Sequence, residues 1–353
     1  MTALESEPES HSGPAAGDAP VLPVTLILVS DFEPGEKTWA DEIAAADAFL
    51  GDPSGVPAEI LILETEGDAA PPPPALLRHG ARLRVERSRV EGSAALKDAA
   101  VPLARFDLVA VVEADCAVRP GWLAAVHARI QADDRPDVVS GRTVYPGDGT
   151  SDGPSDGPSN GALDGALRRV MGLMDRGFAE IPMAGGRWHV SNNAALYRIE
   201  ALRRFPYPQE TDEDLNPFVS AERRQNAMHA AGLRTAFAPQ AACEHAYGGW
   251  PFIIDVRRNK GFQAAERVER RRRAAGRPSA GRPSAGRWGA ALRAAYHGLR
   301  EDLSVARRVG PGRLRPLDWP LLALMIGLVR IWEVQGALAA ADPARFLADS
   351  AYR

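Results

Sequence analysis

The segment Asp107–Leu123 constrains the fold of this chain more than any other stretch of its sequence. Leu108–Val112 is an unbroken apolar and largely β-branched run, which is typical of a strand buried on both faces of a mostly parallel sheet. Glu113 and Asp115 follow at once, and a helix is predicted to start at Pro120. In extended backbone, residues two positions apart point to the same face, so we expect both carboxylates at the carboxyl end of the strand.

This acidic pair has two interpretations. It is either an exposed acidic turn, which is common after strands, or a site for a divalent metal that carries a diphosphate. Mg²⁺ is usually held by one or two carboxylates together with phosphate oxygens, and Glu113 and Asp115 could supply those carboxylates. Other parts of the chain have to separate the two interpretations.

Composition bounds the fold class. The chain has 353 residues, of which 45% are hydrophobic, enough for one large or two modest domains. Residues 1–20 are rich in Glu, Ser, Pro, Gly and Ala and lack an apolar run, so we expect a disordered tail and no signal peptide.

The two cysteines, Cys116 and Cys243, are far apart in the sequence. This argues against a disulfide scaffold or a thiolate zinc site and favours the cytoplasm.

Charge is distributed unevenly along the chain. The formal net charge is -4, yet Arg257–Arg353 holds 20 Lys and Arg against 8 Asp and Glu, a local charge of +12. This basic part duplicates Gly-Arg-Pro-Ser-Ala at Gly276–Ala285, and we predict a low-complexity linker over residues 266–290. Its arginines fit an anionic membrane surface better than nucleic acid, because no aromatic platform or groove-reading motif accompanies them.

The end of the chain is predicted as a helical extension over residues 291–353. Trp319–Trp332 is strongly apolar, although Arg330 and Glu333 break the apolar pattern. Its apolar core, Pro320–Val329, is shorter than the roughly 20 residues that span a bilayer. We therefore expect either an interfacial helix on anionic lipid or a helix that packs on the rest of the chain or on the partner in a homodimer.

Before residue 265 the sequence alternates between predicted strands and helices, which is typical of an α/β domain. The predicted strands are Val24–Val29, Glu59–Leu63, Leu83–Val85, Leu108–Val112 and Val138–Tyr145, and the predicted helices include Trp39–Leu50 and Ser93–Leu103. Ser30 and Asp31 follow the first strand and Glu64 follows the second. Gly147–Gly161 repeats Asp-Gly-Pro-Ser and is predicted as a flexible insertion.

In this order, these features resemble the nucleotide-sugar half of the family 2 glycosyltransferases, which have the GT-A fold. The resemblance rests on strand-Ser-Asp, strand-Glu, Gly-Ser-Ala-Ala-Leu-Lys, and strand-Glu-Ala-Asp followed by Pro-Gly-Trp-Leu. Trp188–Arg198 resembles the Asn-containing segment before the acceptor site of that family, and Ala230–His245 resembles its closing strand with a terminal His. Arg257–Phe262 is similar to the basic segment that follows.

The resemblance implies a GT-A-like, Rossmann-related, mostly parallel sheet flanked by helices over residues 21–265. It also implies inverting transfer of a sugar from a nucleotide-diphosphate sugar, with Mn²⁺ or Mg²⁺, to an acceptor hydroxyl of a glycan, a lipid-linked molecule or a small molecule. One alternative is a GT-A-fold binding protein that has lost catalysis. Another is a sugar nucleotidyltransferase, which would want a Gly-rich basic loop where this chain has the acidic Asp31–Gly35.

The resemblance assigns roles to single residues. The metal would be held by Asp115, Glu113 and His245, with Glu113 at a position where the family usually has Asp. The donor would contact Ser30, Asp31, Glu64, Lys97, Glu113 and Asp115, and the acceptor would contact Trp188, Asn192 and Asn193. Two of these have plain alternatives: Lys97 as a helix-surface lysine, and His245 as a hydrogen-bonded histidine at a strand end.

The catalytic base has two candidate positions. Inverting transfer needs a carboxylate that takes the acceptor proton and stands apart from the metal pair. Glu213 and Asp214 form the Glu-Asp pair that the family often uses, but they lie further before Gly232 than its usual helix allows. Glu222 fits that distance better, although Arg223 stands where Asp is expected. We favour Asp214, keep Glu222 as the alternative, and expect a cytoplasmic protein, peripheral on the inner face of the membrane if the basic extension binds lipid.

Overall fold

The computed structural model describes residues 19–29, 39–66, 71–90, 92–146, 162–207, 217–245, 249–274, 285–340 and 346. The strands are β1 (Val21–Val29), β2 (Val56–Thr65), β3 (Leu83–Ser88), β4 (Leu108–Glu113), β5 (Cys116–Val118), β6 (Val138–Val144), β7 (Ala194–Arg198) and β8 (Thr235–His245). The α-helices are α1 (Ala40–Leu50), α2 (Pro74–Leu77), α3 (Ser93–Ala100), α4 (Trp122–Ile130), α5 (Ala162–Arg176), α6 (Ile199–Arg204), α7 (Pro217–Ala230), α8 (Gly249–Ala274), α9 (Ala285–Arg308), α10 (Gly310–Arg313) and α11 (Asp318–Ala339). Short 3₁₀ turns cover Gly80–Arg82, Val101–Leu103 and Gly177–Glu180.

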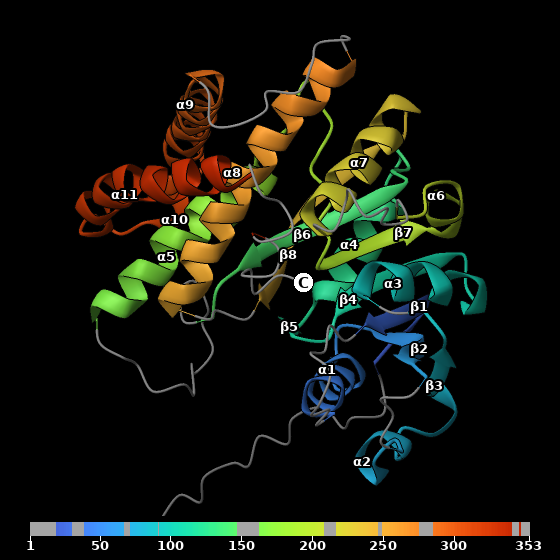
Figure 1. The fold of residues 1–353 in the computed structure, drawn as a ribbon. Coiled ribbons are helices and arrows are strands. Elements are labelled where there is room, and N and C mark those ends of the chain that lie inside the picture. The colour runs from blue at the N-terminus through green and yellow to red at the C-terminus, as the bar shows by residue number, and fades with distance from the viewer. Residues whose placement is uncertain are drawn as a thin grey trace, which may run out of the picture.

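The strands form one eight-stranded sheet in the order β3-β2-β1-β4-β7-β6-β8-β5 (Figure 1). The neighbours among β3, β2, β1 and β4 are parallel, and so are β6 and β8. Strand β7 runs antiparallel between β4 and β6, and the short β5 runs antiparallel to β8. The sheet is therefore mixed, with six strands pointing one way and β7 and β5 the other.

Helices cover both faces of this sheet. α1 and α4 pack on one face together with Leu108, Ala110 and Val112 of β4. α3, α6 and α7 pack on the other face together with Val109 and Val111. Strand β4 is buried on both sides, as its apolar run predicts, because alternate side chains of a strand point to opposite faces. The predicted α/β fold, with a mostly parallel sheet flanked by helices and a helical C-terminal extension, is confirmed.

The helix that follows the acidic pair starts later than predicted. The helix that we expected to start at Pro120 begins at Trp122. Gly121 adopts a left-handed backbone with φ of 81°, which a residue with a Cβ rarely tolerates. Its N–H donates to Asp52 Oδ2 at 2.6 Å, so the turn before α4 is fixed by the loop after α1.

A third apolar core lies beside the sheet and joins α5, α8, α9 and α11 (Figure 1). The backbones of α8 and α11 touch at two glycines. A Cβ on Gly336 would lie 1.8 Å from the carbonyl oxygen of Arg258, and one on Gly261 would lie 1.9 Å from that of Glu333. No side chain fits at either position without moving a helix.

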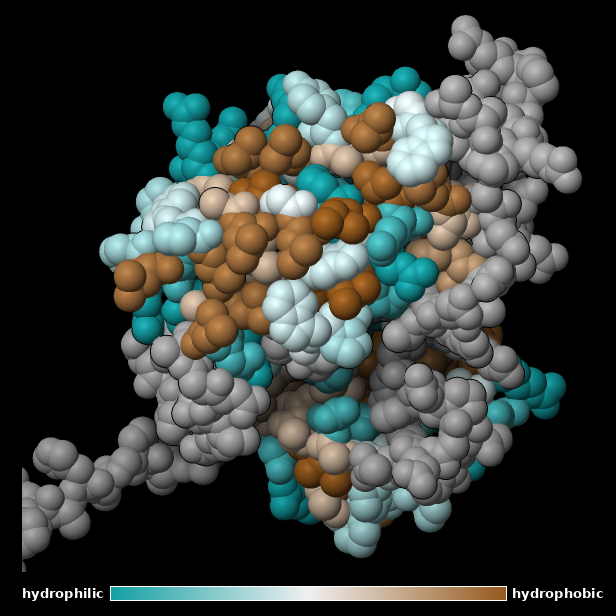
Figure 2. Space-filling view, turned by 60° about the vertical axis from the view of Figure 1, so that its left-hand side comes forward, coloured by the Kyte–Doolittle hydropathy of each residue, from teal (hydrophilic) through white to brown (hydrophobic). Residues whose placement is uncertain are grey.

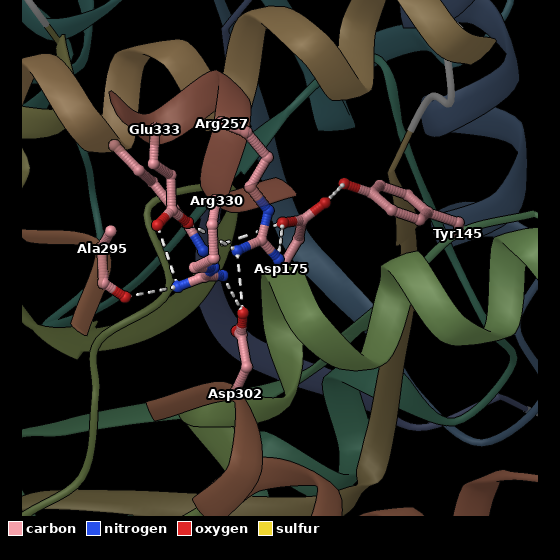
Figure 3. A network of polar contacts seen from close by, with 8 residues as sticks. Tyr145, Asp175, Arg257, Ala295, Asp302, Arg330 and Glu333 are labelled. Atoms are coloured by element: carbon pink, nitrogen blue, oxygen red, sulfur yellow. Dashed lines mark hydrogen bonds and ion pairs between the residues drawn. The ribbon is translucent and has the colours of Figure 1, made fainter. Parts of the chain in front are cut away.

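A buried ionic network ties the same helices together (Figure 3). The guanidinium of Arg257 lies 2.7 Å from Asp175, 3.1 Å from Glu333 and 3.3 Å from Asp302, and all four side chains are buried. Tyr145 donates its hydroxyl proton to Asp175 at 3.2 Å. Burial alone would lower the pKa of Arg257, but the three carboxylates raise it above its usual value, so this residue stays charged.

Helix α11 is longer than the apolar core from which it was predicted. With 22 residues, it is, by length and composition alone, the one helix among the described residues that could cross a membrane. Our expectation concerned the apolar core Pro320–Val329 alone, and the helix that contains it is about twice as long. Arg330 and Glu333, which interrupt the apolar run, turn inward to the network of Figure 3. One side of α11 packs on α5, α8 and α9, which was the second placement that we expected.

Helices occupy both ends of the segment predicted as a linker, residues 266–290. α8 continues past residue 265 to Ala274, and α9 begins at Ala285. Residues 275–284 between them lie outside the described residues, as do most of the predicted tail at residues 1–20 and the predicted insertion at residues 147–161.

Candidate functional site

The candidate site lies at the carboxyl ends of parallel strands β1, β2 and β4. In the sheet register, Val29 at the end of β1 stands opposite Leu63 of β2 and Glu113 of β4. The chain then turns, and the N–H of Ala114 donates to the carbonyl of Val29 at 2.9 Å. Open α/β sheets bind ligands outside the carboxyl ends of their strands, so this edge is where a ligand is expected.

The short strand β5 brings the end of β8 to this edge. Cys116 pairs with His245 in the antiparallel β5–β8 ladder. As a result, the imidazole Nε2 of His245 lies 3.7 Å from Asp115 Oδ2. The pairing explains how a residue 130 positions later in the chain (245 against 115) reaches the acidic pair.

Four side chains form a cluster of potential metal ligands here. One ligand atom from each of Glu113, Asp115, Cys116 and His245 lies within 4.8 Å of all the others. Carboxylate oxygens are the ligands that Mn²⁺ and Mg²⁺ prefer, an imidazole nitrogen is a common metal ligand, and the four ligand atoms lie close enough together for a single ion. Asp115, with 42% of its side chain exposed, opens the cluster to solvent, whereas His245 is 10% exposed. The donor set therefore fits a divalent cation reached from the outside.

The acidic pair comes together for a different reason from the one predicted. We expected Glu113 and Asp115 to share a face of extended backbone. Instead, β4 ends at Glu113, and Asp115 lies in a tight turn before β5. The two carboxylates still share one cluster, because the turn folds Asp115 back toward the end of β4.

Glu113 is held in place by two residues of the predicted site. Lys97 Nζ lies 2.6 Å from one of its carboxylate oxygens, and the side-chain amide of Asn193 donates to the other. Burial pushes the pKa of Glu113 up, but the charges of Lys97 and His245 and the hydrogen bonds from Lys97 and Asn193 hold it below its usual value. Glu113 is thus an ionised, oriented carboxylate. Lys97 is 2% exposed, which excludes the alternative of an ordinary surface lysine.

Asp115 has the opposite electrostatic character. Burial and the nearby negative charge of Glu113 raise the pKa of Asp115, while the charge of His245 partly offsets them. Two carboxylates this close repel each other unless a cation stands near. A divalent cation would relieve that repulsion, which is a second indication that the cluster suits a metal.

Asn192 and Asn193 lie in the segment just before β7, and both reach the site. The carbonyl of Asn192 accepts a hydrogen bond from Lys97 Nζ at 3.2 Å, and its side-chain oxygen accepts one from the Tyr207 hydroxyl. The carbonyl of Asn193 accepts the N–H of Glu113 at 2.8 Å, and its side-chain oxygen accepts a hydrogen bond from Arg176 at 3.4 Å. We predicted both as acceptor-binding residues, and the structure places them as supports of Glu113 and Lys97.

Behind Lys97 lies a layer of buried polar and aromatic groups. The guanidinium of Arg224 stacks over the ring of Tyr207 at 4.1 Å, and the N–H of Tyr207 donates to Asp98 at 2.7 Å. Burial raises the pKa of Asp98 to about 6, with Arg224 acting in the other direction. Tyr207 contacts both site residues, because its ring lies 5.8 Å from Lys97 Nζ and its hydroxyl donates to Asn192, so this layer helps to fix Lys97 and Asn192.

The other predicted residues are spread more widely. Glu64, at the end of β2, is 4% exposed and lies on the same sheet edge, two strands away from Glu113. The backbone N–H of Trp188 donates to the Thr235 hydroxyl, and the Trp188 ring stacks on that of Phe237 with 5.1 Å between the ring centroids. Both partners lie at the opposite end of β8 from His245. The structure therefore does not bring Trp188 to the cluster.

Candidate bases are only partly covered by the described residues. Glu222 is half-buried on α7. Burial lowers the pKa of His189, and the negative charges of Glu301 and Glu222 act weakly in the other direction, so Glu222 lies within electrostatic reach of this histidine. Ser30, Asp31, Glu213 and Asp214 lie outside the described residues. Their roles remain predictions.

Sequence reasoning missed two members of the site. Cys116 joins the cluster because it pairs with His245, and a three-residue strand leaves no periodic signal from which that pairing could be read. Arg176 comes from the end of α5, behind the low-complexity insertion, and nothing in its local sequence connects it to Asn193. The one signal for Cys116 is its place directly after Asp115 in the sequence, which puts it close to the acidic pair.

No protein-family model matches this chain, and no curated protein matches it in sequence. Solved structures match it in shape. The mannosyltransferase PcManGT from Pyrobaculum calidifontis, in complex with GDP-Man and Mn²⁺, shares 14% identity at a TM-score of 0.46, over 94% of this chain and 90% of that chain. Glucosyl-3-phosphoglycerate synthase from Mycobacterium tuberculosis, in complex with Mn²⁺, UDP and phosphoglyceric acid, shares 12% identity at a TM-score of 0.43. The match covers 75% of this chain and 81% of that chain. The S. aureus protein TarS (residues 1–349) shares 14% identity at 0.41, over 91% of each chain.

Proposed function

We propose that this protein is an inverting, metal-dependent glycosyltransferase of the GT-A kind, related to family 2, that transfers a sugar from a nucleotide-diphosphate sugar to an acceptor hydroxyl. The observation that carries the proposal is the cluster of Glu113, Asp115 and His245 at the carboxyl edge of the parallel strands, with Lys97 behind it. An acidic cluster at that edge is suited to a metal that carries a diphosphate.

Each residue of the cluster has a different role in holding the metal. Asp115 would hold Mn²⁺ or Mg²⁺ from the open side, and the more deeply buried His245 and Glu113 would contribute an imidazole nitrogen and an ionised carboxylate. When bound, such a cation supplies positive charge to the diphosphate that leaves with the nucleotide. Lys97, Asn192 and Asn193 keep Glu113 oriented, so the carboxylate does not have to reorganise when the donor binds. Ser30, Asp31 and Glu64 would contact the nucleoside.

A base must take the proton of the acceptor hydroxyl. We propose Asp214, with its neighbour Glu213, and keep Glu222 on α7 as the alternative. Glu222 is half-buried on α7, one turn before Gln225, which accepts the N–H of Val190 in the segment that leads to Asn192. This position agrees with a carboxylate on the acceptor side. Exchange of each for the neutral amide keeps the shape and removes the proton acceptor, so the true base loses turnover and retains donor binding.

The proposal is tested with a panel of nucleotide-diphosphate sugars. Thermal shift with and without Mn²⁺ identifies a donor, because a ligand that binds the folded state raises the melting temperature. Release of the nucleoside diphosphate, by transfer or by slow hydrolysis, is then measured with that donor. A metal-dependent shift followed by release supports the enzyme. A shift with no release at any acceptor tried favours the alternative of a binding protein that has lost catalysis, and release of pyrophosphate from a sugar phosphate and a nucleoside triphosphate favours the nucleotidyltransferase.

A further inference from the structure

The exposed face of α11 carries no charge. All residues of this helix are described, and its exposed side chains follow one another at helical spacing: Trp319, Pro320, Ala323, Leu324, Gly327, Ile331 and Gln335. Leu324 is 65% exposed and Ile331 is 55% exposed. Soluble surfaces place charged residues on the outer face of a helix, so an apolar outer face indicates that something covers it.

A second apolar stripe runs along α9. Trp288, Leu292, Tyr296 and Leu303 are each more than half exposed. They repeat every four or seven residues and therefore lie on one side of the helix. α9 and α11 pack against each other, and Figure 2 shows hydrophobic residues gathered on the helical side of the molecule.

Arginines border this apolar face. Arg293, Arg300 and Arg307 repeat every seven residues, and each follows directly on, or lies one turn from, a member of the α9 stripe. Leu303, Ser304, Arg307 and Arg308 line a hollow, where apolar and basic side chains meet. Over residues 285–340, the exposed acidic side chain is Glu301 alone, because Asp302, Asp318 and Glu333 are buried.

We propose that the outer face of α9 and α11 docks on an anionic lipid membrane. Trp and Tyr beside a basic row are suited to the interface between headgroups and acyl chains, and arginines are attracted to anionic lipid. A second copy of the chain is a poorer occupant, because a two-fold interface sets the same patch of both subunits together. It would then place two rows of arginines side by side with little acidic charge to meet them.

Sedimentation of the full-length protein with vesicles tests the proposal. Binding is compared between phosphatidylcholine vesicles and vesicles that also contain phosphatidylglycerol, at low and at high salt. We expect pelleting with the anionic vesicles and its loss at high salt. Pelleting that is equal with neutral vesicles, or absent with anionic vesicles at low salt, overturns the proposal.

Two variants and their matched controls locate the surface. Arg293→Gln, Arg300→Gln and Arg307→Gln together should weaken binding to anionic vesicles by on the order of 100-fold. The control removes equal charge from exposed arginines elsewhere, Arg82→Gln, Arg87→Gln and Arg234→Gln, and should bind within a few-fold of the wild type. Leu324→Gln with Ile331→Gln should also lose binding, whereas Leu77→Gln with Leu103→Gln, on exposed leucines outside this face, should retain it.

The oligomeric state provides the opposing outcome. If the wild type is a dimer by sedimentation velocity and the α11 pair of substitutions makes it a monomer without changing vesicle binding, the face joins two copies, and the membrane proposal is wrong. None of these substitutions touches the metal cluster. Failure here therefore leaves the proposed glycosyl transfer as it stands, and failure of that proposal leaves this one.

Discussion

Lys97 and Glu113 form an ion pair with 2.6 Å between Nζ and Oε1, and their side chains are only 2% and 14% exposed. Lys97 lies on α3 and Glu113 ends β4, so the pair locks a helix onto the strand that carries the metal cluster. Substitution of Lys97 and Glu113 measures how much this ion pair contributes to the free energy of unfolding.

We predict that Lys97→Met lowers the free energy of unfolding at pH 7 by about 3 kcal/mol, because it leaves a buried carboxylate without its cation. The loss should be smaller at pH 4. The wild-type pair lowers the pKa of Glu113, so its stabilisation is present above the unfolded pKa and fades as pH falls. Urea denaturation measures both values. Adding Glu113→Gln to Lys97→Met should recover part of the loss, and a double variant less stable than the single one would contradict this account.

Substitutions in the metal cluster should change Mn²⁺ affinity according to which side chains are ligands. Asp115→Asn should lower Mn²⁺ affinity at least about 100-fold by calorimetry, whereas Asp133→Asn, on an exposed loop, should leave it unchanged.

Cys116→Ser should change Mn²⁺ affinity by less than about threefold. A hydrogen bond with Cys243 and then burial raise the pKa of the Cys116 thiol, and a neutral thiol is a poor ligand for a hard cation.

The cluster also shows what the sequence could reveal. Glu113 and Asp115 could be found because a buried parallel strand has a strong apolar signature, and the carboxyl end of such a strand is a binding edge. His245 came only from the resemblance, since the contact that brings it to Asp115 is the three-residue ladder of β5 with β8. Local propensity cannot predict such a short strand, because it forms only when its partner is in place.

The C-terminal helices show the opposite case. The apolar run at Trp319–Trp332 predicted a helix, but not which of its sides is buried. The buried side is set by Gly261 and Gly336, where two helices touch, and by the pairing of Arg257 with Glu333. These are long-range contacts between residues that, taken singly, are compatible with exposure. Trp188 illustrates the same limit, since its stacking on Phe237 joins residues that are 49 positions apart (188 against 237).

Asp98 should make stability depend on pH near neutrality. Burial raises the pKa of Asp98 to about 6, so the folded state holds its proton more tightly than the unfolded state does. Its contribution is therefore fully present below the unfolded pKa and is lost as pH rises through about 6. Asp98→Asn should accordingly be more stable than the wild type by about 1 kcal/mol at pH 7.5, discounted for partial solvent access, and show no gain at pH 4.

Denaturation of both proteins across this pH range measures the difference. In the Asp98→Asn variant, the side-chain amide oxygen can still accept the N–H of Tyr207, so the main hydrogen bond is kept. Asp133→Asn serves as the control for the substitution itself. A constant difference between Asp98→Asn and the wild type from pH 4 to pH 7.5 would show that Asp98 does not titrate in this way.

The last prediction concerns how closely α11 approaches α8. Gly336 and Gly327 lie on the same helix, but a Cβ on Gly336 would meet the carbonyl oxygen of Arg258 at 1.8 Å, and one on Gly327 would meet nothing within 4 Å. Gly336→Ala should therefore lower the free energy of unfolding by about 2 kcal/mol or more, because backbone atoms must move apart. Gly327→Ala should raise it by roughly 0.5–1 kcal/mol, since alanine favours a helix more than glycine does. Urea denaturation of the two variants compares one residue change at two places on one helix, so helix propensity cancels and the difference reports the contact with α8. Equal effects of the two substitutions would mean that α11 does not pack as closely on α8 as the glycines indicate.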